Sequence, residues 1–192
     1  MSNYQKARIS GIGAPKQLGR LRFARERKAM LDSVWVVGLL CVAITMGLSL
    51  AHALELPGKL RLGEAEYRIV QSVYYPGFTI GGLIGELGGI IVLIGVLVLL
   101  PKETRRYCWT VVSLVLLCAV HAVYWLMTHP VNNFWVSTVP KPKAASTFFG
   151  TFSQGERDWR QLRRQWESSH IVRACLGMAS LTTLAISQTI DN

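Results

Sequence analysis

Four apolar blocks are the feature of this sequence that most restricts its fold. They occupy residues 34–54, 78–100, 107–127 and 171–190. A helix needs about 20 predominantly apolar residues to cross a hydrocarbon layer of roughly 30 Å. Segregation into blocks also explains how a chain that is 51% hydrophobic carries a net charge of +10. The sequence therefore predicts an all-α integral membrane protein, with residues 30–192 forming one domain built as a bundle of four transmembrane helices.

Basic residues indicate the orientation of these helices. Residues 1–29 form a basic arm with one acid, Glu26, and the link between the second and third blocks reads PKETRRY. Such segments remain in the cytoplasm under the positive-inside rule, which predicts that both termini are cytoplasmic. The loop at residues 128–169 is also basic, although it would lie outside, and it argues against this orientation.

The basic arm is open to three interpretations. It could be the orientation signal alone, a contact for anionic lipids, or a docking segment for an acidic partner. Nucleic acid is not expected as a partner, because the basic run lacks interleaved aromatic residues and adjoins a membrane helix. The first apolar block ends in Ala-His-Ala at 51–53, similar to a signal-peptide cleavage site. Its apolar run is longer than a signal segment, so we expect a retained helix.

Two segments connect the blocks on the predicted outer side. Residues 55–77 are too polar and too short to span, so we expect a loop or a short interfacial helix there. The longer connection contains Trp159, Leu162 and Trp166 at helical spacing. This spacing predicts an amphipathic helix at about residues 156–169 that leads into the fourth block.

Glu86 is the one acid well inside a predicted membrane segment. It lies roughly 12 Å from the outer end of its block, and His121 lies roughly 10 Å from the outer end of the next, at 1.5 Å per residue. The two side chains could therefore meet. A carboxyl group at this depth indicates a functional site, although it could also be protonated or hydrogen-bond a neighbouring helix. His121 could likewise be an ordinary buried imidazole, whereas His52 and His129 are expected near the solvated interface.

Three glycines near Glu86 share one helix face. Gly81, Gly85 and Gly89 are spaced by four residues, which lets another helix backbone approach closely. A partner membrane protein could pack on this face.

The motif Glu167-x-x-His170 places a carboxylate and an imidazole on one helix face. In di-iron carboxylate bundles this spacing brings both side chains to one metal centre. A complete site of that kind needs two such pairs, and this chain has one. Glu167 could instead pair with Arg163, with His170 at the water boundary. Arg173, one turn further in, could reach outward or neutralise an anionic ligand or Glu86.

Two motifs carry a family resemblance. The sequence VNNFW at 131–135 and the run WxxLRxxWExxHxxR at 159–173 resemble the DUF1772, or anthrone-oxygenase-like, membrane proteins. The resemblance implies oxidation of an anthrone to an anthraquinone by molecular oxygen, without an organic cofactor. It also implies a substrate site in the outer half of the bundle, formed by the loop residues Asn132 and Asn133 with Trp166 and Arg173. The basic arm and the Pro-Lys-Pro stretch at 140–142 have no counterpart in the family.

The favoured hypothesis is a membrane oxidoreductase or oxygenase that acts on a hydrophobic, aromatic or quinone-like substrate from the bilayer. Its candidate catalytic residues are Glu86, His121 and His170. We expect the protein to have either no cofactor or a bound iron or copper ion, in preference to haem. The candidate metal ligands are Glu86, His121, Glu167 and His170.

Two other functions remain open. A haem-binding electron carrier would use His121 and His170 as axial ligands. An accessory or assembly subunit would bind a membrane protein through the glycine face and the basic arm. No two of the four cysteines form a CxxC pair, which argues against a disulfide oxidoreductase.

Overall fold

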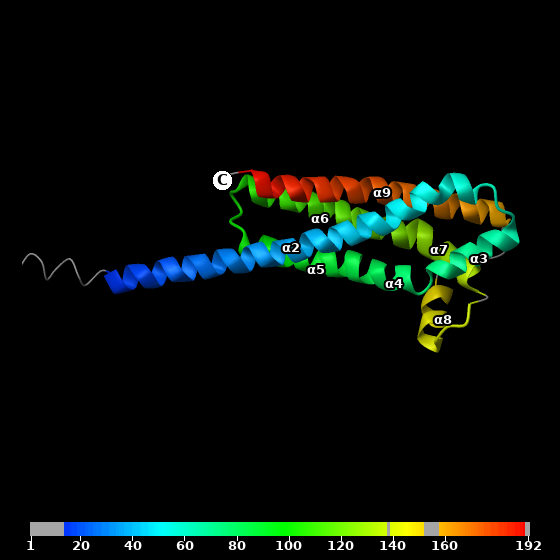
Figure 1. Ribbon diagram of the computed structural model, residues 1–192, viewed down its shortest axis with the longest axis horizontal. Helices are drawn as coiled ribbons and strands as arrows, with labels where there is room; N and C mark the ends of the chain where they lie inside the picture. The colour runs from blue at the N-terminus through cyan, green and yellow to red at the C-terminus, as the bar shows by residue number, and fades with distance from the viewer. Residues whose placement is uncertain (1–13, 138, 152–157, 191–192) are drawn as a thin grey trace, which may run out of the picture.

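The computed structural model describes residues 14–137, 139–151 and 158–190, and every regular element within them is a helix. Four stretches are long and apolar enough to cross a membrane, and they run side by side (Figure 1): Gln17–Lys59, Gly77–Leu99, Arg105–Val136 and Trp159–Thr189. The prediction of an all-helical chain with four such helices is confirmed. These helices fit contact with a lipid bilayer.

Helix α2 (Ala14–Lys59) is far longer than the predicted first block. Its 46 residues extend over roughly 69 Å at 1.5 Å per residue, more than twice a hydrocarbon layer. The part of the basic arm that is described continues the transmembrane helix without a break, and residues 1–13 of the predicted arm lie outside the described residues. Residues 20–30 are rich in Arg, Lys, Glu, Leu and Ala, which favour helix wherever tertiary contacts are few.

The second crossing consists of three consecutive helical pieces, α4 (Gly77–Gly82), η1 (Leu83–Gly88) and α5 (Gly89–Leu99). It packs closely against α2. A Cβ atom added at Gly85 would lie 2.6 Å from Thr45 Oγ1 and 3.0 Å from the Thr45 backbone nitrogen. At Gly81 the nearest atom would belong to Leu48, also on α2.

The interpretation of the glycine face as a partner site is therefore wrong. Gly81, Gly85 and Gly89 let α2 of the same chain approach, and a Cβ at Gly89 would also meet Leu117 at 2.9 Å. Close helix contact was predicted correctly, but the neighbouring helix is internal.

The third crossing continues beyond the predicted block as α6 (Arg105–Val123), η2 (Tyr124–Thr128) and α7 (His129–Val136). Asn132 and Asn133 therefore lie on a helix, and their expected position in a loop is wrong. Pro130 does not end the helical run: it follows the π turn η2 directly and lies at the start of α7.

The fourth crossing is one continuous helix, α9 (Trp159–Thr189), which joins the predicted amphipathic helix to the fourth block. Residues 156–157 of that prediction lie outside the described residues. Asp158 caps the helix by accepting a hydrogen bond from the Arg160 backbone nitrogen. Two short helices, α3 (Glu64–Tyr74) and α8 (Lys143–Gly150), complete the described fold.

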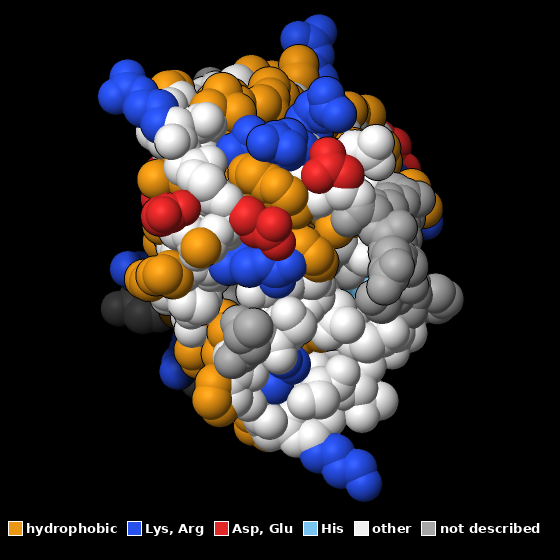
Figure 2. Space-filling view, turned by 90° about the vertical axis from the view of Figure 1, so that its right-hand side faces the viewer, with side chains coloured by type: hydrophobic (Ala, Val, Ile, Leu, Met, Phe, Trp, Pro, Cys, Tyr) orange, Lys and Arg blue, Asp and Glu red, His pale blue; other side chains and the backbone are white. Residues whose placement is uncertain are grey.

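The short elements gather at one end of the molecule. In Figure 1, α3, α7 and α8 lie at the end opposite to the start of α2 and the finish of α9. Figure 2 looks onto this end and shows Lys and Arg beside Asp and Glu among hydrophobic side chains. One such pair joins Arg68 to Glu64 at 2.9 Å. The start of α2 and the end of α9 thus lie at the same end of the described molecule, and the cytoplasmic assignment of that end stays a prediction.

The apolar core lies toward the other end of the long helices. Val42, Leu93, Leu117 and Leu184 from all four crossings are fully buried there. Ser113 and Ser180 hydrogen-bond across α6 and α9 at 3.0 Å. Polar contacts of this kind hold membrane helices together. The end that carries α3, α7 and α8 is instead hollow, and the candidate site lies there.

Candidate functional site

Glu86 lies on η1 and is bound by side chains from two other crossings. His121 Nδ1 on α6 is 3.0 Å from Glu86 Oε2, and an Arg173 guanidinium nitrogen on α9 hydrogen-bonds to Glu86 Oε1. Only 4% of the Glu86 surface is exposed. The structure thus brings Glu86 and His121 together at one depth, as the sequence predicted, and adds Arg173 as the counter-charge.

Two π-helical segments flank this contact. Glu86 lies inside η1, and η2 begins at Tyr124, directly after the helix that carries His121. The wider π turn shifts the register of the side chains that follow and is frequent at functional sites. Neither segment has a recognisable sequence signal.

The hydrogen bonds of His121 fix its tautomer. Trp125 Nε1 lies 2.9 Å from His121 Nε2, and an indole N–H can only donate. His121 Nε2 therefore accepts, and the ring proton is on Nδ1, from which it is donated to Glu86. The pair is a neutral imidazole oriented by a carboxylate, with its basic nitrogen on the side away from that carboxylate.

His170 supports Arg173 from the same helix. Its Nδ1 lies 2.9 Å from the Trp166 carbonyl oxygen, which can only accept, so Nδ1 carries the proton. His170 Nε2 then accepts from Arg173 Nη1 at 3.3 Å. The imidazole is buried and contacts the guanidinium that binds Glu86, and the catalytic role of His170 stays a prediction.

The residues predicted to bind substrate separate into two groups. Trp166 Nε1 donates to Asn132 Oδ1 at 3.0 Å, which ties α9 to α7 beside Arg173. Asn132, Trp166 and Arg173 line a common cavity. Asn133 is half-buried on another face of α7 and is not among the cavity residues, so the structure gives it no part in the site.

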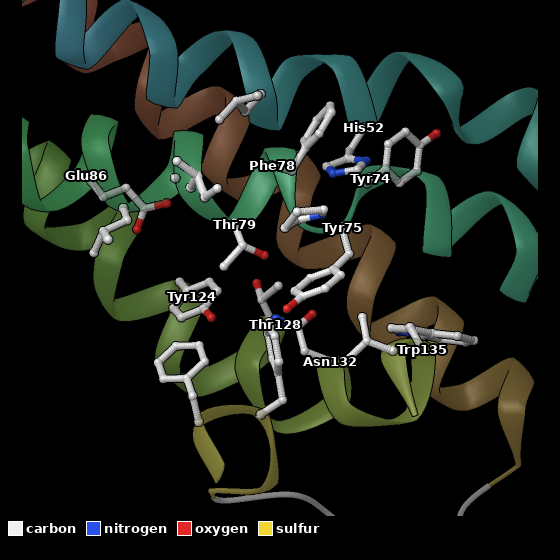
Figure 3. A pocket seen from close by; sticks show the side chains of 18 of the residues that line it. His52, Tyr74, Tyr75, Phe78, Thr79, Glu86, Tyr124, Thr128, Asn132 and Trp135 are labelled. Atoms are coloured by element: carbon white, nitrogen blue, oxygen red, sulfur yellow. The ribbon is translucent and has the colours of Figure 1, made fainter. Parts of the chain in front are cut away.

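The cavity has a volume of about 610 Å³, and residues of all four crossings, of α3 and of α8 line it. Its wall is mainly aromatic and aliphatic. Figure 3 shows Glu86 at one end of the labelled side chains and Trp135 at the other, with Tyr75, Thr79 and Tyr124 between them. Small-molecule sites in proteins have volumes of roughly 300–1,000 Å³ with a few fixed polar groups in apolar walls.

One side of the cavity reaches an exposed apolar surface. The wall includes exposed side chains from the second crossing, from η2 and from α8, namely Ile80, Leu83, Leu87, Trp125 and Phe148. Four of these side chains lie on the second and third crossings, which would face hydrocarbon. The fifth, Phe148, lies on the short helix α8 beside them. An apolar molecule could therefore enter sideways from the bilayer.

Glu167 belongs to a second cluster, which adjoins the first where the His52 ring packs on Trp166 and His170. Its Oε1 accepts a hydrogen bond from the Tyr67 hydroxyl at 2.6 Å and lies 3.9 Å from Lys59 Nζ. Arg163, considered as its partner in the sequence, donates instead toward backbone carbonyl oxygens at the end of α2. Burial, together with the Glu167 charge, raises the pKa of Tyr67 above its ordinary value, which keeps the hydroxyl protonated.

The sequence singled out neither Tyr67 nor Lys59 of this cluster, and Lys59 is the less expected of the two. The Lys59 side chain is buried, which is unusual for a lysine. Its Nζ lies 2.9 Å from Glu55 Oε2. The same atom lies 4.8 Å from the ring centroid of Tyr74 and 4.9 Å from that of Trp166. The four-residue spacing of Glu55 and Lys59 was the available signal, because such pairs share a helix face.

His52 and His129 are also buried, so their expected solvated position is wrong. Lys59 Nζ lies 3.3 Å from His52 Nδ1, and the His52 ring lies 4.5–4.6 Å from the rings of Tyr74, Trp166 and His170. His129 packs in the aromatic wall against Trp125 and Phe148. The end helices α3 and α8 cover both histidines, which the sequence could not indicate.

The predicted metal ligands do not form a metal site. Both Glu86 oxygens accept hydrogen bonds, Arg173 supplies a positive charge at the same carboxylate, and Glu167 bonds elsewhere. Within residues 14–137, 139–151 and 158–190, no three His, Cys, Asp or Glu side chains are arranged to hold a metal ion. A haem held by His121 and His170 does not fit either, because the Glu86–Arg173 pair lies between the two rings.

Comparison with protein-family models, with curated proteins and with solved structures gives no match for this chain. The resemblance to the anthrone-oxygenase-like proteins therefore stays an expectation from its sequence motifs, and the function must be argued from the cavity and its polar groups.

Proposed function

We infer that this chain is a membrane protein that takes an apolar aromatic or quinone-like molecule from the bilayer and catalyses proton transfer on it. The observation that carries this proposal is the cavity itself. It joins a lipid-facing opening to a buried group of ionisable residues, Glu86, His121 and Arg173. Placing charged side chains at the inner end of an apolar cavity costs free energy. Two helices could pack together without this cost, so the charged side chains favour a functional role over a purely structural one.

His121 is the proposed base. Its Nε2 carries the lone pair, and among the described residues its one hydrogen-bond partner is Trp125, a partly exposed side chain that lines the cavity. A substrate C–H or O–H group that displaces the Trp125 indole would meet this lone pair. Glu86, bonded at Nδ1, would orient the ring and stabilise the imidazolium that forms, as the carboxylate does in hydrolase triads.

Arg173 is the proposed electrostatic partner of the product. Deprotonation of an aromatic ketone at the carbon next to its ring system leaves an enolate-like oxygen, and a fixed cation in a cavity of low polarity stabilises such charge. The His170 imidazole and the Tyr124 ring, 5.4 Å from the guanidinium carbon, hold Arg173 in place. Glu86 is in this scheme a positioning residue, since both its oxygens are already bonded.

Oxidation by molecular oxygen is the narrower form of the proposal and depends on the sequence resemblance. For anthrone, the deprotonated ring gives its electrons to O₂, and the products are anthraquinone and one molecule of water. In this scheme His121 removes the substrate proton and Arg173 stabilises the negative charge that results, and neither residue takes up electrons. The accessory-subunit alternative loses one of its arguments, because α2 occupies the glycine face.

The test uses the full chain in lipid nanodiscs with anthrone as the probe. We expect the protein to accelerate deuterium incorporation at the acidic carbon of anthrone, followed by oxygen uptake, relative to empty nanodiscs. His121→Gln should slow the exchange by about 10²–10⁴-fold, the range for a general base. Exchange at the rate of the empty nanodiscs with the wild-type chain would refute the proposed chemistry. Uptake of oxygen without faster exchange would refute the role of His121.

A further inference from the structure

The end of the cavity opposite to Glu86 carries two buried hydrogen-bond donors without a strong acceptor. Trp135 Nε1 has no hydrogen-bond partner among the described residues, and neither has Gln71 Nε2. Both side chains line the cavity, with only 2% of Trp135 and 4% of Gln71 exposed. An unpaired buried donor costs about 1–3 kcal/mol, so most such groups in proteins have a partner.

Neighbouring residues limit what these donors can do within the chain. The Trp135 ring packs edge-on to Tyr67, with centroids 4.8 Å apart, and the Tyr67 hydroxyl gives its proton to Glu167. The Gln71 amide lies one helical turn from Tyr67 and could place at most one of its two N–H groups on that hydroxyl. At least one N–H group of Gln71 and the indole N–H of Trp135 therefore remain for another acceptor.

The charge around these donors selects the kind of acceptor. Both donors are neutral. Beyond the Tyr67 hydroxyl, the Glu167 carboxylate lies 3.9 Å from Lys59 Nζ, so the two charges offset each other. An anion at this end would lose its hydration without a charged donor at these two residues to replace it. A neutral oxygen, as in a ketone, quinone or ester carbonyl, would accept from both N–H groups without that penalty.

We propose that Gln71 and Trp135 form a distal subsite that binds a neutral carbonyl oxygen of the cavity's ligand. The ligand is then an elongated molecule whose apolar body fills the aromatic cavity, with its reacting group at His121 and its carbonyl oxygen at the end formed by α3 and α7. Figure 3 shows the two ends, with Glu86 and Trp135 at opposite sides of the labelled group. The subsite rests on the proposed function only in assuming that the cavity holds an apolar ligand.

The test compares three anthracenes of nearly the same shape in equilibrium dialysis against nanodiscs that contain the full chain, with empty nanodiscs as the blank. The probes are 2-acetylanthracene, which carries a neutral carbonyl, 2-isopropenylanthracene, which replaces the oxygen by a methylene group, and 2-anthroate, which is an anion. We expect wild-type protein to bind the ketone about three- to tenfold more tightly than the hydrocarbon, the effect of one or two neutral hydrogen bonds. The anion should bind most weakly.

Variants decide whether these two residues cause the preference. Trp135→Phe and Gln71→Leu should each reduce the preference for the ketone while the hydrocarbon still binds. Trp35→Phe is the matched control, because Trp35 is also buried but donates to Ser187 in the core. The subsite is refuted if the ketone preference is absent or is the same in all four proteins. If no anthracene binds to the wild type, the apolar site itself fails, and the subsite with it.

Discussion

Arg173 donates a hydrogen bond to Glu86, a residue 87 positions earlier in the chain, and both side chains are buried. The contact joins the second and fourth crossings at the depth where His121 of the third crossing also binds Glu86. Three of the four crossings that line the cavity are thus connected through one carboxylate, and this connection makes the site sensitive to single substitutions.

The Glu86–Arg173 pair should contribute strongly to stability. Removing one partner leaves the other as an unpaired buried charge, which costs about 3–5 kcal/mol. We therefore expect Glu86→Gln and Arg173→Gln each to lower the free energy of unfolding, measured by SDS titration in mixed micelles. The double variant should be more stable than the sum of the two effects implies.

Arg22→Gln provides the control for that series. Arg22 forms an ion pair with Glu26 at 2.9 Å, but both side chains are exposed on α2. An exposed pair one helical turn apart contributes about 0.3–0.5 kcal/mol. A loss at Glu86 or Arg173 no larger than that at Arg22 would mean that the buried pair is not formed.

Trp125 should restrain the proposed base. Its indole N–H occupies His121 Nε2, and a substrate must displace it. Trp125→Phe keeps an aromatic side chain but removes the donor, so we expect deuterium exchange into anthrone to be equal to or faster than in the wild type. A loss comparable to that of His121→Gln would contradict this arrangement, because it would make the indole itself necessary for proton transfer.

The sequence predicted the contacts of Glu86 better than their surroundings. The depths of Glu86 and His121 followed from helix rise alone, because both lie in uninterrupted apolar blocks whose ends are easily located. Arg173 followed from its place one turn beyond His170. These predictions needed only local regularity, which a single sequence contains.

The rest depended on contacts between distant segments. Lys59 is buried because α3 and α9 supply Tyr74, Glu167 and Trp166 around it, and none of these is near it in sequence. Asn132 was expected in a loop, whereas it lies on α7, a helix that packs on α3 and α9. The sequence could not give these tertiary neighbours.

The contact at Gly85 should tolerate no side chain. An added Cβ would lie 2.6 Å from Thr45 Oγ1 and close to backbone atoms of α2, which cannot move without separating the helices. Overpacking of this kind costs about 1–3 kcal/mol, so Gly85→Ala should lower the free energy of unfolding.

Gly95→Ala is the matched control for this contact. Gly95 lies on the same crossing, and an added Cβ would meet no atom within 4 Å. The higher helix propensity of alanine should leave this variant unchanged or more stable, by up to about 1 kcal/mol. Equal stability of the two variants would contradict the close approach of α2 at Gly85.

Tyr67 should make the fold sensitive to alkaline pH. Burial and the Glu167 charge raise its pKa above the ordinary value of 10.0, so the folded chain keeps a proton that the unfolded chain releases. The stabilising contribution is complete below about pH 10 and falls above it, by up to about 1.4 kcal/mol for each pH unit. Tyr67→Phe removes this titration.

Denaturant titrations at about pH 8 and about pH 11 test that dependence. At the lower pH the variant should be less stable by about 1–3 kcal/mol, because Glu167 loses a buried donor. At the higher pH the difference should shrink, since only the wild type then holds a proton that the unfolded chain has lost. Tyr107→Phe, at the opposite end of the molecule, controls for the loss of a hydroxyl group. A constant difference between the Tyr67 variant and the wild type across this range would show that the Tyr67–Glu167 hydrogen bond does not hold the proton.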